Sequence, residues 1–329
     1  MRRALIIAFL SIVLLAGIAG GTGYFWLKSS FHAASPVPVD TVVMIKRGSG
    51  ISAISQQLEK DGLIPDANVF KFGLKFFDDS RPLRAGEYKV PAGASPAEIA
   101  RVLKESEQIT YRITVAEGLS SSEVVEQLRG DPVLVGEIDK IPPEGALLPE
   151  TYHFHRGETR AGILMRMQAY MQRALSKAWA ARQSELPISS PEEAVILASI
   201  VEKETGLDNE RGKVAGVFVN RLRKGMRLHS DPTVVYGITL GAGPLGRGLR
   251  RSELDAKTPY NTYQINGLPP TPIANPGLAS IQAVLNPEAT EALYFVADGT
   301  GGHVFSKTLS EHNRNVRAWR KIERARQKN

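Results

Sequence analysis

The feature that most constrains this chain is an uncharged run near its N-terminus, from Ala4 to Leu27. As a helix, these 24 residues would measure roughly 36 Å, enough to cross the hydrocarbon core of a bilayer once. Arg2 and Arg3 precede the run, and basic residues tend to stay on the cytoplasmic side. We therefore expect everything after Lys28 to lie outside the cytoplasm.

The same run could be an anchor that is kept or a signal peptide that is removed. Aromatic residues at 24–26 are typical of a membrane interface and favour a retained anchor. The small residues at 16–20 would suit a signal peptidase, so cleavage is the alternative. Residues 28–39 are rich in Ser, Ala and Pro and predict a short spacer, after which a folded domain begins near Asp40.

The basic residues are concentrated at the two ends of the chain. The formal charge is +7, yet residues 314–329 hold seven Lys or Arg against one Glu, and Arg2 and Arg3 add two more positive charges. The body is nearly neutral, which argues against a nucleic-acid-binding domain. We expect the basic tail to form a solvated terminal helix. The absence of cysteine excludes disulfides, thiol nucleophiles and Cys-ligated metals.

Three stretches repeat one pattern: an apolar residue, a glycine three positions later, and apolar residues six and ten positions beyond that glycine. The members are Ile45/Gly48/Ile54/Leu58, Val90/Gly93/Ile99/Leu103 and Val115/Gly118/Val124/Leu128. This spacing predicts a strand, a glycine turn and an amphipathic helix, with Ser49, Ser95 and Ser120 as helix N-caps. Such units resemble LysM-type modules, which hold glycan chains in a shallow groove. A compact α+β scaffold without that role is the alternative.

The best-signalled helix of the chain runs over residues 191–205. The segment Ser190 to Glu193 is a capping box with proline at the first helical position, and an apolar run follows it at 194–201. Gly206 is placed to end the helix. Because the middle is apolar all round, we expect this helix to be buried.

Two carboxylates, Glu202 and Glu204, stand at the end of this helix. Glu202 shares its face with the small residues Ala198 and Ser199, which would leave room above a carboxylate in a partly dry cleft, where its pKa would rise. Glu204, nearer the end, should reach water more easily. Glu202 is therefore the better candidate for a general acid. The alternative is a pair of exposed glutamates at a fraying end.

Five other residues are candidates for substrate binding. A second helix over residues 208–224, with Asp208 as N-cap and Gly225 as terminator, carries Asn220 beside its apolar stripe. Asp231 could place a second carboxylate near a cleft or simply form an Asx turn. Aromatic and amide side chains before a proline-braced loop suit contacts with sugars, and the alternative is a purely structural loop; these residues are Tyr260, Asn261 and Tyr263.

No metal or cofactor is expected. His153 and His155 would share one strand face, but the chain has no HExxH helix and no evident third ligand. The glycines at 299–302 do not form GxGxxG.

At this point the sequence resembles the endolytic murein transglycosylases of the YceG-like (MltG) type. The matching stretches are EGALLPETY at 144–152, LASIVEKET at 197–205, VFVNRLRKGMRL at 217–228, SDPTVVYG at 230–237, YNTYQINGLPPTPIANPG at 260–277 and LYFVADGTGGHVFS at 293–306. They follow one another in the family's order behind a single anchor. His229 departs from the uncharged polar residue that the family has at this position.

The resemblance implies a peptidoglycan lyase that cuts the β-1,4 bond between N-acetylmuramic acid and N-acetylglucosamine in nascent strands. It implies 1,6-anhydromuramyl ends, a role as terminator of glycan polymerisation close to peptidoglycan synthases, and Glu202 as the catalytic acid and base. One carboxylate can suffice for this chemistry because the sugar's own C6 hydroxyl attacks its anomeric carbon.

Together these predictions describe an α+β protein of the inner membrane with its catalytic domain on the outer side. They divide it into a cytoplasmic tip and anchor (1–27), a linker (28–39), a LysM-like domain (40–110) and a catalytic domain (111–329). A peptidoglycan-binding scaffold without activity is one rival. A hydrolytic muramidase that uses Glu202 with Glu204 or Asp231 is the other.

Overall fold

The computed structural model describes residues 2–326 and confirms the mixed α+β class. The chain divides into two compact units. The first comprises the residues up to Tyr111 together with His153–Arg156, and the second comprises Arg112–Tyr152 and the residues from Gly157 onward. Strands β3 (Tyr111–Thr114) and β4 (Thr151–Phe154) pair with each other.

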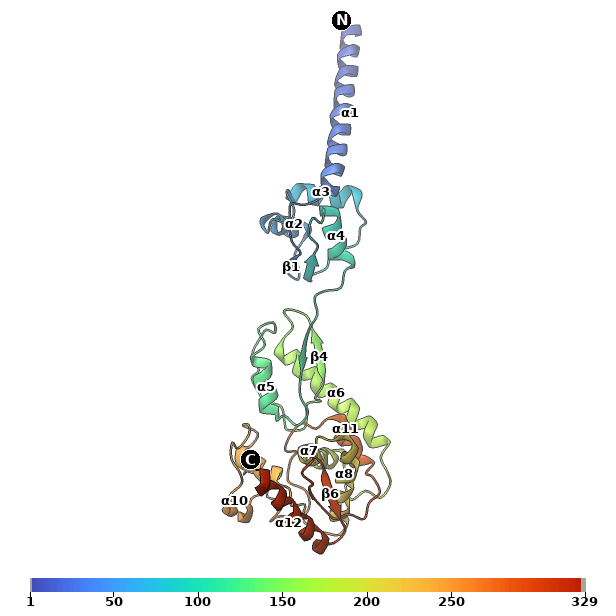
Figure 1. Ribbon diagram of the computed structural model, residues 1–329. Coiled ribbons are helices and arrows are strands. Elements are labelled where there is room, and N and C mark those ends of the chain that lie inside the picture. The colour runs from blue at the N-terminus through green and yellow to red at the C-terminus, as the bar shows by residue number, and fades with distance from the viewer. Residues whose placement is uncertain (1, 327–329) are drawn as a thin grey trace. The chain divides into compact units, whose positions relative to one another are not determined.

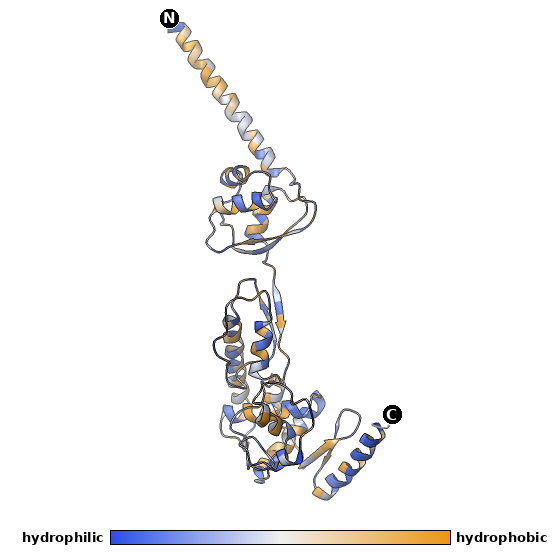
Figure 2. Cartoon of the chain, turned by 90° about the vertical axis from the view of Figure 1, so that its left-hand side faces the viewer, coloured by the Kyte–Doolittle hydropathy of each residue, from blue (hydrophilic) through white to orange (hydrophobic). Residues whose placement is uncertain are grey.

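Helix α1 (Arg2–His32) is continuous and apolar over most of its length (Figures 1 and 2). It is long and apolar enough to cross a membrane, and its apolar stretch is not buried by the rest of the protein. The predicted spacer at 28–39 is wrong over its first part, because the helix continues to His32. Phe31 explains the extension: it is 1% exposed, packs near Phe70 and occupies the space directly over Gly73, where a Cβ would collide with its ring.

The first unit is built on an antiparallel pair of strands covered by three helices. Strands β1 (Thr41–Ile45) and β2 (Gly86–Val90) pair with Val43 opposite Tyr88. The helices are α2 (Ile51–Lys60), α3 (Ala67–Phe77) and α4 (Pro96–Glu105). The order along the chain is strand, two helices, strand, helix.

The three predicted strand, glycine and helix units are present. Gly48, Gly93 and Gly118 all have φ between 70° and 81°, a left-handed conformation that favours glycine. The paired apolar residues of each helix are buried: Ile54 with Leu58, Ile99 with Leu103, and Val124 with Leu128.

Two of the three predicted N-caps are confirmed. Ser95 and Ser120 accept hydrogen bonds from the amides of Glu98 and Glu123 in full capping boxes. The prediction of Ser49 as an N-cap is wrong, because α2 starts one residue later. Its N-cap is Gly50, which has no side chain to cap the helix.

The second unit surrounds the buried helix α7 (Pro191–Glu204). Residues 194–201 are all buried, as predicted, and α11 packs against α6, α7 and α8. The remaining elements are α5 (Ser121–Arg129), α6 (Arg160–Ala180), α8 (Asp208–Arg223), α9 (Asp231–Thr239), α10 (Arg251–Asp255), α11 (Leu278–Leu285), β5 (Tyr294–Ala297), β6 (His303–Ser306) and α12 (Leu309–Arg326). Strands β5 and β6 form an antiparallel hairpin on which α12 packs.

The helix ends differ in detail from the prediction. Ser190 caps α7, but the side chain of Glu193 bonds to Ser189 instead, so the capping box is incomplete. Extended Thr205 ends the helix, without a left-handed glycine. Asp208 is the first residue of α8 and not its cap, because its carboxylate pairs with Arg211 one turn on.

The segment from 256 to 277 contains no helix or strand, yet it is firmly held. Its Asn275 is fully buried; the side chain accepts from the Leu147 amide (3.0 Å) and donates to the Leu119 carbonyl (3.1 Å). A loop whose backbone is pinned in this way can present side chains to a ligand in a fixed geometry.

Candidate active site

Glu204, the last residue of α7, lines a cavity of about 850 Å³ in the second unit. The walls are built by the end of α8 with the segment after it, the start of α9, the 256–277 segment through Tyr263, strand β5, and helix α12. The polar side chains that face it besides Glu204 include Arg221, His229, Asp231 and Tyr263.

The carboxyl of Glu204 is held in a form that can donate a proton at neutral pH. Burial raises its pKa from 4.5 to about 7, and the charge of Asp231 adds to this effect. The hydroxyl of Ser230 donates to its Oε1 (2.5 Å) and acts in the opposite direction, lowering the pKa. A pKa near the working pH is what general acid and base catalysis requires.

The segment that covers Glu204 is fixed by a buried hydroxyl network. The amide of Ser230 donates to the Thr262 hydroxyl (2.9 Å), which lies 2.9 Å from the hydroxyl of Thr233. All three residues are at most 1% exposed. The position of Ser230 against Glu204 is therefore determined by the fold.

Asp231 and Tyr263 form a pair at the same cavity. The Tyr263 hydroxyl donates to Asp231 Oδ1 (2.7 Å), and burial raises the pKa of Tyr263. The ring of His229 stacks on that of Tyr263, with the ring centroids 4.9 Å apart. The backbone of His229 is left-handed, with a φ of 52°. Burial, followed by the charges of Arg221 and Arg227, lowers the pKa of His229, which favours the neutral imidazole.

Arg221 stabilises another wall of this cavity. It is 7% exposed, and it donates to the carbonyls of Leu293 and Leu228, both at 2.6 Å. Its guanidinium lies over the Tyr294 ring, 5.2 Å from the centroid. These contacts fix the wall and leave a buried positive charge beside the cavity.

Glu202 has a different environment from that of Glu204, and its role as the catalytic residue stays a prediction. Its Oε2 accepts from the amide of Gly277 (2.9 Å), at the start of α11. The space above Ala198 and Ser199 is filled, because the amide of Ile273 donates to the Ser199 hydroxyl (3.0 Å). Burial raises the pKa of Glu204, although its position near the helix end had led us to expect that it would reach water more easily.

The sequence pattern of the YceG-like family matches residues 43–318. The chain belongs to the YceG-like family. A Bacillus subtilis (strain 168) relative of this YceG-like protein, named endolytic murein transglycosylase, is 30% identical over 327 aligned residues, covering 89% of each chain.

Two further relatives of this YceG-like protein come from other bacteria. A Streptococcus pneumoniae (serotype 2) protein of the same name is 28% identical, and the match covers 95% of this chain and 65% of that one. A crystal structure of a YceG-like protein from Listeria monocytogenes shares 31% identity, covers 84% of this chain and 99% of its own, and has a TM-score of 0.49.

Three of the predicted substrate-binding residues of this YceG-like protein do not reach the cavity of Glu204. The amide of Asn220 donates to the carbonyls of Thr290 (2.7 Å) and Ala292 (3.2 Å). Asn261 is fully buried and donates to three backbone carbonyls at 253–256. Tyr260 bonds to Thr271 (2.8 Å) and lines a separate cavity of about 590 Å³. Asp231 and Tyr263, by contrast, line the cavity of Glu204.

Sequence reasoning missed Ser230, although it lies in a stretch of the YceG-like resemblance. The only signal was its position next to Asp231, which gave no indication of its contact with Glu204. Among residues 2–326, no three His, Cys, Asp or Glu side chains are grouped closely enough to hold a metal ion.

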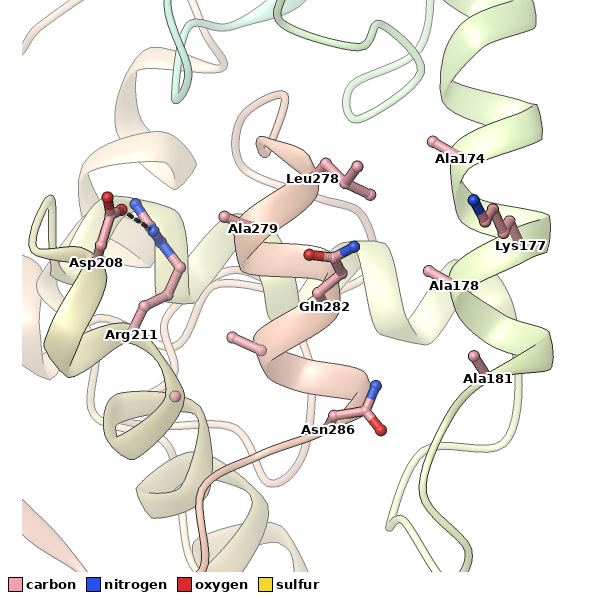
Figure 3. Close-up of a pocket in the computed structure, with 12 residues that line it drawn as sticks. Ala174, Lys177, Ala178, Ala181, Asp208, Arg211, Leu278, Ala279, Gln282 and Asn286 are labelled. Atoms are coloured by element: carbon pink, nitrogen blue, oxygen red, sulfur yellow. Dashed lines mark hydrogen bonds and ion pairs between the residues drawn. The ribbon is translucent and has the colours of Figure 1, made fainter.

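Another cavity of the second unit has a volume of about 620 Å³ (Figure 3). None of the residues predicted to act in catalysis or substrate binding lines it. Alanines of α6 face α11 across it, and the Asp208 and Arg211 pair of α8 lies on its other side. This cavity lacks the raised-pKa carboxyl of the YceG-like candidate site.

Proposed function

We propose that this protein is a membrane-anchored lytic transglycosylase that cleaves peptidoglycan strands endolytically, with Glu204 as both acid and base. The names of its relatives support the class of reaction. The observation that carries the assignment of the residue is the partly buried carboxyl of Glu204, whose raised pKa of about 7 and fixed contact with Ser230 suit proton transfer at neutral pH.

In the first step, protonated Glu204 gives its proton to the oxygen of the β-1,4 bond between N-acetylmuramic acid and N-acetylglucosamine. The bond from that oxygen to the muramyl C1 breaks, and the carboxylate of Glu204 remains. The C6 hydroxyl of the same muramyl residue then attacks C1, and its proton returns to Glu204. The product is a 1,6-anhydromuramyl end, and no water is consumed.

Asp231 has two roles in this scheme. Its charge helps to keep Glu204 protonated before the reaction, and it offsets the positive charge that develops on the sugar as the bond breaks. The Tyr263 hydroxyl holds its carboxylate in place.

Two alternatives remain in view, each with an observation in its favour. Glu202 is the acid if the resemblance places the catalytic residue correctly, and it would act from its bond to Gly277. A hydrolytic muramidase would use Asp231 to activate water, since Asp231 lines the same cavity as Glu204.

The rest of the chain brings this site to newly made strands. We propose that α1 is a retained single-pass anchor of the inner membrane and that both folded units lie on its outer side. The first unit acts as a LysM-like glycan-binding module; a cavity of about 540 Å³ on it, lined in part by Ile51, Ile54 and Lys71, offers a place for a strand. Anchoring beside peptidoglycan synthases would let the enzyme terminate polymerisation.

Product analysis tests the reaction class. Peptidoglycan digested by the full-length protein in detergent should yield muramyl ends lighter by one water than hydrolysed ends, as measured by mass spectrometry. Reducing ends of normal mass would support the muramidase instead, and no cleavage would support the scaffold. For the topology, a reporter fused after Asn329 should be extracytoplasmic, and cytosolic activity of that reporter would contradict the anchor's orientation.

A further inference from the structure

The basic C-terminal helix α12 forms one wall of the cavity of Glu204. Seven of its residues line that cavity: Leu309, His312, Asn313, Val316, Trp319, Arg320 and Glu323. Their spacing of three and four residues places most of them on one face of the helix. The prediction of a merely solvated tail is therefore incomplete, because one face of this helix belongs to the candidate site.

This wall contains a polar atom that the protein leaves unused. The Nδ1 of His312 is buried and has no hydrogen-bond partner among the residues that the structure describes. The His312 ring stacks on Tyr294 at 5.2 Å, which fixes its orientation. A buried polar atom without a partner costs free energy, so a ligand group that reaches it would be favoured.

The wall also holds a cation that has no partner among residues 2–326. Arg221 and Arg227 line the same cavity, but both donate to backbone carbonyls, Arg227 to that of Tyr263 at 2.8 Å. Arg320 is exposed and, within residues 2–326, makes neither a hydrogen bond nor an ion pair. Its guanidinium is free to bind a carboxylate.

Trp319 lies beside Arg320 on the same wall. Its ring is partly buried against the turn of the β5–β6 hairpin, near Gly299, so it is held in place and offers part of its surface to the cavity. A fixed aromatic face next to a free cation suits a ligand that has an apolar sugar face and an acidic substituent.

We propose that α12 recognises the peptide stems of the substrate: Arg320 binds a stem carboxylate while Trp319 packs against a neighbouring sugar ring. The proposal rests on the proposed function, because it takes peptidoglycan as the substrate. In intact strands the lactyl group of each muramyl residue is tied up in an amide bond to the stem. The free carboxylates therefore belong to the stem. Glu323 lies one turn after Arg320 on the same wall and should oppose their binding.

The test compares two forms of one substrate with the full-length protein in detergent. One form is intact peptidoglycan strands; the other is the same strands after carbodiimide coupling with methylamine has converted the stem carboxylates into neutral amides. The readout is the ratio of kcat/KM for the charged form to that for the neutral form. Cleavage of the neutral form by the wild-type protein reports on the proposed function separately from this ratio.

Arg320→Gln should lower that ratio by about fivefold, the upper range for an exposed charge pair, mainly through KM. Glu323→Gln should raise it. Arg317→Gln is the matched control: Arg317 is an exposed cation of the same helix that does not line the cavity, and its loss should leave the ratio unchanged. Trp319→Ala should raise KM for both substrates equally, and Trp319→Tyr should restore most of the loss.

Three results would overturn the proposal. One is a ratio that Arg320→Gln does not change. The second is an equal effect of Arg317→Gln and Arg320→Gln, which would indicate general attraction to a basic helix. The third is a fall in the ratio on Glu323→Gln. If the wild-type protein cleaves neither form, the proposed function fails as well.

Discussion

Replacing Glu204 by Gln should make the protein more stable at pH 8 and leave its stability unchanged at pH 4.5. In the unfolded chain this carboxyl ionises near 4.5, whereas burial in the folded state raises its pKa to about 7. Below 4.5 both states are protonated. As pH rises through this window, the unfolded state loses its proton first, so ionisation favours unfolding.

The size of the effect follows from the two pKa values. At about 1.4 kcal/mol for each pH unit between them, the full cost above pH 7 is about 3 kcal/mol. Because the side chain is only partly buried, we expect about half of this, roughly 1.5 kcal/mol. For a unit of this size, that corresponds to a rise in Tm of about 3–6 °C. Gln keeps the carbonyl oxygen that accepts from Ser230, so few contacts change.

Calorimetry of the full chain in detergent at the two pH values measures this difference. Glu202→Gln is the control, because it weakens the acceptor of the Gly277 amide and should lower Tm slightly at pH 8. An increase for Glu204→Gln of the same size at both pH values would refute the reasoning. An increase in Tm for Glu202→Gln alone would also refute it.

Further predictions concern the pH profile, the buried amide, the helix junction and metals. Ser230→Ala removes a bond that lowers the pKa of Glu204, so the basic limb of kcat/KM should move to higher pH; Asp231→Asn removes a charge that raises it and should move the limb to lower pH. A limb that neither variant moves would contradict Glu204 as the acid. Asn261→Ala should cost about 2–3 kcal/mol of stability in denaturant titrations because carbonyls lose their donor, with KM little changed; a higher KM at full stability would return Asn261 to the substrate site. Phe31→Ala should destabilise the first unit by about 3–4 kcal/mol in thermal melts, and an unchanged melt would contradict its role. Activity should survive dialysis against EDTA; a loss that zinc or magnesium restores would contradict the mechanism.

The sequence predicted well those features that short-range signals determine. Glycines at 48, 93 and 118 are required by a left-handed turn, and Ser95 and Ser120 start helices through bonds to residues three positions away. The apolar run of α7 likewise specified a buried helix. In each case the cause lies within a few residues of the effect.

The choice between Glu202 and Glu204 depended on contacts that no local pattern contains. Helical spacing gives the angle between the two side chains but not what covers each face. Ser230 reaches Glu204 from 26 residues away, and Gly277 reaches Glu202 from 75. The same limit applies to Asn261, whose amide could bind a sugar or a backbone carbonyl, and in this fold it binds backbone carbonyls.

The most direct test of the central assignment compares Glu204→Gln with Glu202→Gln in the same cleavage assay at pH 7. Glu204→Gln keeps size and hydrogen bonding but cannot transfer a proton, so its kcat should fall by about 10²–10⁴. Glu202→Gln should retain far more activity, since the carboxylate of Glu202 accepts a hydrogen bond from the Gly277 amide. The opposite order, with Glu202→Gln inactive and Glu204→Gln close to wild type, would contradict the assignment of Glu204 as the catalytic acid and base.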